Sequence, residues 1–287
     1  LNDFGPSSFE VAADGSFTQV DFLSFTSLRQ VHAVFVDGQP ILLANQFVGN
    51  FFAPIIALAN GFLNADAAKV DDGTTEFGGP SAFASATIGG KTIIFVAGAT
   101  DDGISSFELV GNGVDIINLD NVEDADNLAQ FQLQGVNSLA TANVAGTTYL
   151  IAGGFDDDGI SVFSVAANGL MINVDNATDV GLRELNGVAA LTTAVFGNKT
   201  FLFAAGQIDD GVSVFEIAAD GTLTDIDFIQ DSDNAAFNLD GVNSLTTAKI
   251  AGTTYLFAGA GHLGAGVDDG VSVFAVAADG TLINFAN

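Results

Sequence analysis

Apolar and polar residues alternate in short stretches along most of the chain, and the stretches come in sets of four. One such set comprises residues 191–196, 200–206, 211–218 and 222–229, which are rich in Val, Ile, Phe and Thr. A period of two places successive side chains on opposite faces of a strand, and β-branched and aromatic residues favour strands. No run is long enough to demand a helix. The pattern therefore predicts sets of four antiparallel strands joined by short links.

The set of four strands repeats along the chain. Asp-Asp-Gly followed by an alternating strand occurs four times, and the successive motif glycines are 56, 52 and 59 residues apart. A divergent copy begins at Leu28, and a stretch from Ser7 resembles the second half of another copy. Four antiparallel strands every ~50 residues are typical of a β-propeller blade. A β-solenoid is the alternative, but its coils are usually shorter and lack two-residue hairpin turns such as Asp37-Gly38.

We therefore expect an all-β chain that forms a single β-propeller domain. Five complete copies and one half copy favour six blades, with the missing half blade supplied by further chain or by a partner; seven blades are the alternative. The expected units are the half blade 1–25 and the blades 26–78, 79–132, 133–185, 186–238 and 239–287.

The repeat also resembles a known family. Residues 148–169 read TYLIAGGFDDDGISVFSVAANG, and residues 255–282 contain YLFAGAG and DDGVSVFAVAADGTL. These stretches resemble the lactonase-type (YVTN-like) repeats of 6-phosphogluconolactonase-like propellers. The DDG-rich copies are also similar to those of large secreted bacterial proteins that carry RTX-type calcium-binding repeats. The resemblance implies the propeller fold, but it implies less about function, because propellers host many unrelated activities.

The composition is strongly acidic, with 35 Asp and Glu against six Lys and Arg and a formal charge of −29. Nucleic acids and anionic lipids require basic surfaces, so neither is expected as a partner. No apolar stretch reaches the ~18 residues of a membrane-spanning helix, so membrane insertion is not expected. The absence of cysteine excludes disulfides and thiolate chemistry. Few basic residues also disfavour a phosphorylated substrate.

The acidic residues concentrate in the links before the third strand of each blade and between blades, so we expect one strongly negative face. Calcium prefers carboxylate and carbonyl oxygens, and paired aspartates beside a glycine could supply part of a site. Alternatively, Asp-Asp-Gly only adopts turn dihedral angles and solvates a loop. Calcium is the one cofactor that the sequence suggests. The candidate metal ligands are Asp101, Asp102, Asp157, Asp158, Asp209, Asp210, Asp268 and Asp269.

The two histidines are the candidates for catalysis. His32 lies in the predicted first strand of its blade, where the other copies have Ala or Thr, and a packed strand residue is the plainer interpretation. His262 lies in a Gly-rich link that is longer than its counterparts. Other recurring residues favour structural roles: the serines occupy one strand position and the phenylalanines another. These sets are Ser105, Ser161, Ser213 and Ser272, and Phe107, Phe163, Phe215 and Phe274.

These observations favour a non-enzymatic propeller that serves as a structural or binding module in adhesion or assembly, because the blades are nearly uniform and no catalytic set is evident. We expect a secreted or cell-surface bacterial protein that binds a protein or glycan or associates with itself. The alternative is a lactonase-like hydrolase that acts on an uncharged lactone.

Overall fold

The computed structural model describes residues 7–11, 17–22, 28–46, 50–57, 63–65, 68–111, 115–126, 131–261 and 270–286. The chain divides into two compact units, one of residues 1–122 with 167–170 and the other of residues 123–166 with 171–287. The described residues contain no helix that is long and apolar enough to cross a membrane.

The first unit begins with the antiparallel pair β1 (Ser7–Val11) and β2 (Phe17–Phe22), which corresponds to the expected half copy. The second sheet contains β3 (Leu28–Val36), β4 (Gln39–Gln46), β5 (Phe51–Ala57) and β6 (Leu63–Ala65), and β7 (Lys69–Val70) also pairs with β5. The third sheet contains β8 (Pro80–Ile88), β9 (Lys91–Gly98), β10 (Gly103–Val110) and β11 (Asp115–Glu123).

The second unit contains three sheets of four strands each. They are formed by β12 (Val136–Val144), β13 (Thr147–Gly154), β14 (Gly159–Val165) and β15 (Met171–Thr178); by β16 (Val188–Phe196), β17 (Lys199–Gly206), β18 (Gly211–Ile217) and β19 (Leu223–Gln230); and by β20 (Val242–Ile250), β21 (Thr253–Ala260), β22 (Gly270–Val276) and β23 (Leu282–Ala286). Two short 3-10 helices, η1 (Asp124–Asp126) and η2 (Asp231–Asp233), lie in links between sheets.

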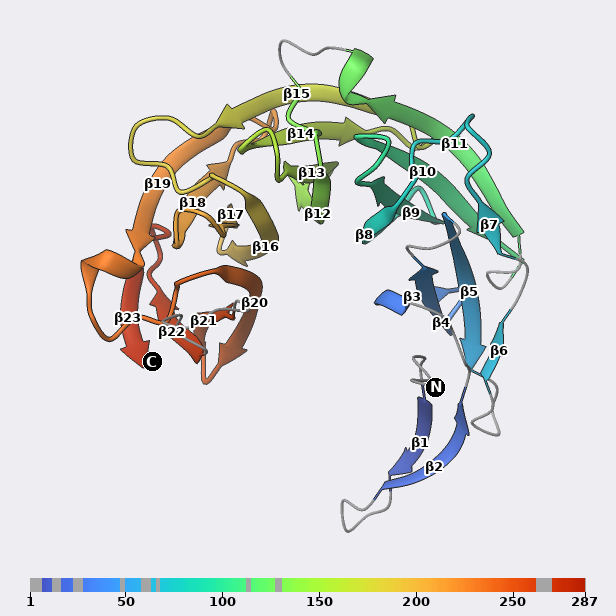
Figure 1. Ribbon diagram of the computed structural model, residues 1–287, viewed down its shortest axis with the longest axis horizontal. Helices are drawn as coiled ribbons and strands as arrows, with labels where there is room; N and C mark the ends of the chain where they lie inside the picture. The colour runs from blue at the N-terminus through green and yellow to red at the C-terminus, as the bar shows by residue number, and fades with distance from the viewer. Residues whose placement is uncertain are drawn as a thin grey trace. The chain divides into compact units, whose positions relative to one another are not determined.

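In each sheet the strands pair antiparallel in chain order, as Figure 1 shows. The turns between first and second strands have positive φ at both central residues in Asp37-Gly38, Ala145-Gly146 and Ala251-Gly252. This is the hairpin geometry that matches the right-handed twist of the strands. The sheets are therefore antiparallel meanders, which confirms the all-β prediction and excludes the parallel coils of a solenoid.

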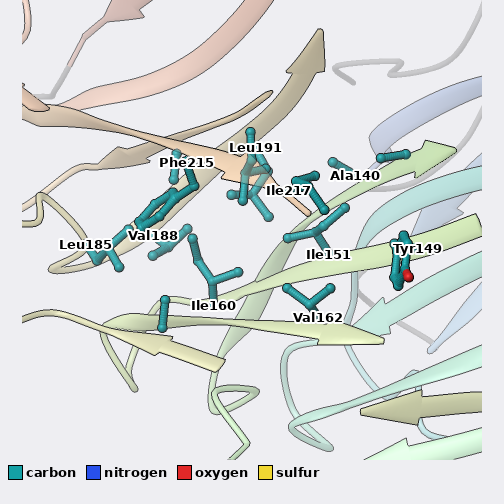
Figure 2. Close-up of a cluster of buried hydrophobic side chains, with 14 of the residues drawn as sticks. Ala140, Tyr149, Ile151, Ile160, Val162, Leu185, Val188, Leu191, Phe215 and Ile217 are labelled. Atoms are coloured by element: carbon teal, nitrogen blue, oxygen red, sulfur yellow. The ribbon is translucent and has the colours of Figure 1, made fainter. Parts of the chain in front are cut away.

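Consecutive sheets of the same unit pack face to face through apolar side chains. One cluster joins β12–β14 to β16 and β18, and it includes Ile151, Val162, Leu191 and Phe215 (Figure 2). A second cluster joins the sheets β16–β19 and β20–β23, and a third joins β3–β5 to β8–β10 in the first unit. Burying one large apolar side chain stabilises the fold by about 1.5–3 kcal/mol, so these clusters hold the sheets together.

The recurring phenylalanines are core residues, as the sequence predicted, and Phe107, Phe215 and Phe274 belong to these clusters. Phe107, Phe163, Phe215 and Phe274 are at most 1% exposed. In the first unit, Phe107 also makes edge-to-face contacts with Phe52 and Phe77 at centroid distances of 5.4 and 5.6 Å. A structural role for this position is therefore confirmed.

Candidate active site and the Asp-Asp-Gly loops

The first aspartate of each described Asp-Asp-Gly motif that begins a third strand binds the link that leads into its own sheet. A side-chain oxygen of Asp101 accepts a hydrogen bond from the Gly78 amide at 2.6 Å, and Asp157 accepts one from Gln134 at 2.8 Å. Asp209 accepts one from the Asn186 amide at 2.9 Å. Each pair is 23 residues apart, so the contact repeats with the strands. The carboxylate thus satisfies a backbone N–H in a link that lacks a strand partner.

In the second unit, the second aspartate of the motif binds the link that leads into the following sheet. Asp158 accepts a hydrogen bond from the Gly187 amide at 2.8 Å, and Asp210 accepts one from Gly241 at 2.7 Å. Both aspartates have positive φ, 55° and 56°, a conformation that Asp and Asn tolerate better than most residues. In the first unit Asn50, with φ 46°, does the same for the Gly79 amide at 3.0 Å. The paired aspartates therefore connect consecutive sheets.

The predicted metal ligands that the structure describes thus lie in loops where aspartate carboxylates accept hydrogen bonds from backbone amides. Among the residues that the structure describes, no group of three or more His, Asp or Glu side chains is arranged to hold a metal ion. Asp268 and Asp269 lie outside the described residues. Burial raises the pKa of Asp101, and the Gly78 N–H partly offsets this. Calcium binding stays a prediction, while the alternative of turn dihedral angles agrees with the observed positive φ.

The recurring serines, which lie on the third strand of their sheets, bind the same links through their hydroxyl groups. The hydroxyls of Ser161, Ser213 and Ser272 accept hydrogen bonds from the amides of Gln132, Glu184 and Asn238 at 2.7–2.8 Å. All three serines are at most 1% exposed. A buried hydroxyl that satisfies a backbone donor has a structural role, as the sequence predicted.

His32 has a different environment, because it meets a hydroxyl on the next sheet of the first unit. Its Nε2 lies 2.9 Å from Oγ of Ser85, so β3 and β8 bring a base and a potential nucleophile into hydrogen-bond contact. The imidazole also stacks on Phe83, with ring centroids 6.2 Å apart and an angle of 27° between the planes. Both His32 and Ser85 are half-buried.

Burial lowers the pKa of His32 below its usual value of 6.5. The imidazole is therefore neutral at pH 7, and with its proton on Nδ1 it can accept the Ser85 proton at Nε2. A neutral histidine within hydrogen-bond reach of a serine is the arrangement that general-base activation of a hydroxyl requires. The pair is the candidate active site. His262, the other candidate, lies outside the described residues.

His32 was a candidate from the sequence, but Ser85 was not. At the position of Ser85 the later copies have Thr141, Thr193 and Thr247. The hydroxyls of Thr193 and Thr247 donate to the backbone carbonyls of Thr141 and Thr193, at 3.1 and 3.4 Å. One feature of the sequence could have indicated Ser85: the copy that follows the one with His32 has a serine where the later copies have a threonine.

No protein-family model and no curated protein sequence matches the chain. The similarity to RTX-type proteins therefore has no support from sequence comparison.

Solved structures do resemble the chain. A protein of Bacteroides fragilis, provisionally named a 6-phosphogluconolactonase, has a TM-score of 0.71 and 18% identity, over 99% of this chain and 77% of its own. A protein of Bacteroides uniformis with the same provisional name has a TM-score of 0.71 and 14% identity, over 98% of this chain and 76% of its own. The periplasmic gluconolactonase PpgL of Pseudomonas aeruginosa has a TM-score of 0.59 and 19% identity, over 79% of this chain and 63% of its own.

These neighbours correct the leading functional hypothesis. A non-enzymatic module for adhesion or assembly was expected, but three of the structures that resemble the chain, with TM-scores of 0.59–0.71, bear the names of lactonases, as the alternative anticipated. Uniform blades do not by themselves exclude an active site, because near-identical repeats can still differ at one pair of positions such as His32 and Ser85. At identities below 20% the likeness establishes the fold. The chain is therefore a β-propeller built of four-stranded antiparallel blades, similar in fold to proteins named as lactonases.

Proposed function

We propose that the protein is a lactonase-like hydrolase that opens an uncharged lactone, with His32 and Ser85 as its reacting pair. The observation that carries this proposal is the 2.9 Å contact between a neutral imidazole and a hydroxyl, in a fold shared with proteins named as lactonases. The fold alone would leave the activity open, because propellers support unrelated reactions.

The proposed reaction uses groups on this chain and one water molecule. His32 Nε2 takes the Ser85 proton while Oγ attacks the lactone carbonyl carbon, and the ring C–O bond breaks. The proton passes from the imidazolium to the ring oxygen, which leaves a hydroxyacyl ester on Ser85. A water molecule, deprotonated by His32, then attacks the ester, releases the hydroxy acid and restores Ser85. This is the general course of hydrolysis by an activated hydroxyl.

The charge of the chain supports an unphosphorylated substrate. Six basic residues against 35 acidic ones offer little to neutralise a phosphate, and one of the six, Lys91, is paired with Glu108 at 2.7 Å. A neutral lactone has no such requirement. Glucono-1,5-lactone is therefore the first substrate to test.

The test measures acid release from glucono-1,5-lactone in weak buffer with a pH indicator, after subtraction of the uncatalysed rate. His32→Ala and Ser85→Ala should each lower kcat/KM by at least ~100-fold, the usual contribution of a general base or nucleophile. The matched control is Thr192→Ala, at the position that corresponds to His32 in a later copy, and it should retain the activity.

The melting temperature of each variant shows whether its fold is intact. A wild-type protein that does not accelerate hydrolysis of any neutral lactone in a panel would refute the proposal. Folded His32→Ala and Ser85→Ala variants with wild-type activity would refute the assignment of the pair.

A further inference from the structure

The second unit contains a pocket of about 390 Å³ that the proposed reaction does not use. It lies between the link that follows β15 and the outer strand β19. The residues that line it include Val180, Leu182, Arg183, Asp225, Asp227 and Phe228. A volume of this size is in the range of small-molecule sites.

Arg183 occupies a position that is aromatic in the neighbouring repeats. Phe131 packs edge-to-face on Phe163 at a centroid distance of 5.6 Å, and Phe237 packs on Phe274 at 5.3 Å. At the same point Arg183 places its guanidinium 5.6 Å from the ring centroid of Phe215. A planar cation thus replaces a core phenylalanine and brings hydrogen-bond donors to this site.

The link that carries Arg183 is also shorter than its counterpart. The Asp179 carboxylate accepts a hydrogen bond from the Leu185 amide, six residues later, whereas Asp231 accepts one from Leu239, eight residues later. The longer link contains η2, and the link 179–187 has no such helical turn. The shorter link and the exchange of Phe for Arg together distinguish this repeat from the next one.

The guanidinium is held in one orientation. Nε and one terminal nitrogen of Arg183 donate to the two carboxylate oxygens of Asp225 at 2.8 and 3.1 Å, and another nitrogen donates to the Thr178 carbonyl at 3.1 Å. Three of the five N–H groups are thus used, which leaves two donors. The Asp225 side chain is 63% exposed, so its oxygens can accept further hydrogen bonds.

Apolar side chains form the other wall of the pocket. Val180 is 59% exposed, Leu182 63% and Phe228 40%. Single exposed apolar residues are ordinary, but three around one pocket form an apolar surface whose burial by a ligand would be favourable. The pocket therefore combines an apolar wall with a fixed Arg–Asp pair.

We propose that this pocket binds a small uncharged molecule with an apolar ring or chain and at least one hydroxyl group. A hydroxyl can donate to Asp225 and accept from Arg183, whereas a carboxylate can only accept and would face two aspartates, Asp225 and Asp227. The apolar part of the ligand would cover Leu182 and Phe228. The site is independent of lactone hydrolysis, because it stands on the geometry of the second unit alone.

The test titrates the whole chain with cyclohexanol and with cyclohexanecarboxylate, which share one ring, and follows the backbone amide NMR signals. Cyclohexanol should shift the signals of residues 180–183 and 225–228 with a Kd of about 1 mM, as expected for a ligand of this size. Cyclohexanecarboxylate should bind at least ~10-fold more weakly because of the carboxylates. Equal or tighter binding of cyclohexanecarboxylate would overturn the proposal, as would a lack of shifts with cyclohexanol.

Arg183→Phe restores the residue of the neighbouring repeats and should weaken cyclohexanol binding at least ~10-fold without loss of the fold. Leu182→Ser, at an exposed position, provides a second variant with the same expected loss. The control is Ile250→Ser, which alters another apolar surface, lined by Tyr255 and Phe285, and should bind like the wild type. Wild-type affinity in folded Arg183→Phe and Leu182→Ser would overturn the proposal.

Discussion

Removal of the Asp158 carboxylate should destabilise the second unit by an amount that the structure allows us to work out. The carboxylate accepts a hydrogen bond from the buried Gly187 amide at 2.8 Å, and Asp158 has φ 55°. In Asp158→Ala the amide loses its partner, at a cost of about 1–3 kcal/mol. An alanine in the left-handed region costs about 1–2 kcal/mol more. The expected loss in free energy of unfolding is about 2–5 kcal/mol.

Asp158→Asn is the matched variant, because its side-chain oxygen can still accept and asparagine tolerates positive φ. Asn50 already makes the corresponding contact in the first unit. We therefore expect Asp158→Asn to lose less than about 1 kcal/mol. Urea unfolding followed by circular dichroism measures both variants. An alanine variant as stable as the wild type, or an asparagine variant as unstable as alanine, would refute the structural role assigned to the motif.

Four further outcomes are expected. Burial, together with the charges of Asp209, Asp179 and Asp233, raises the pKa of Glu184 above its usual 4.5, so the contribution of this group to stability is lost as the pH rises through the raised value. Glu184→Gln should therefore stabilise the fold at pH 7 and have little effect below pH 4.5. Urea unfolding at the two pH values measures both effects. Phe215→Ala should cost about 3–5 kcal/mol in the same assay, whereas a cost below about 1 kcal/mol would contradict its place in the core. The kcat/KM of lactone hydrolysis should fall at acid pH with an inflection below 6.5, since the pKa of His32 is lowered, and an inflection above 6.5 would exclude His32 as the base. If the Asp-Asp-Gly loops bind calcium, the melting temperature should be higher in millimolar calcium than in chelator, and equal melting temperatures would exclude such a site.

The fold was predictable because each strand carries its own signal. Alternation marks the strands, and turns such as Ala145-Gly146 mark the hairpins. The shift of register between Val214 and Phe215, opposite β19, could not be read in this way, because a bulge adds one residue without changing the residue types around it. The number of blades in a closed propeller stays a prediction.

The sites were less predictable because they depend on contacts between copies. The acidic links were found in the sequence, but the hydrogen bonds that Asp158 and Asp210 accept from Gly187 and Gly241 need the packing of consecutive sheets. The pair of His32 and Ser85 crosses from one sheet to the next in the same way. Arg183 is readily found in the sequence. That it replaces an aromatic residue of the repeat becomes clear only from the structure, where Phe131 and Phe237 pack on phenylalanines of their own sheets.

The hydrogen bonds that Asp158 and Asp210 accept from the following sheet also bear on how such a chain can gain or lose repeats. Asp158 and Asp210 each reach forward, and Gly187 and Gly241 each receive the contact from behind. The repeat that forms β16–β19 thus carries an acceptor for the following sheet, Asp210, and a donor for the preceding one, Gly187, both within its own ~50 residues. A gene segment for one unit can be copied or deleted without leaving mismatched boundaries, so tandem duplication would preserve the interlock at each step.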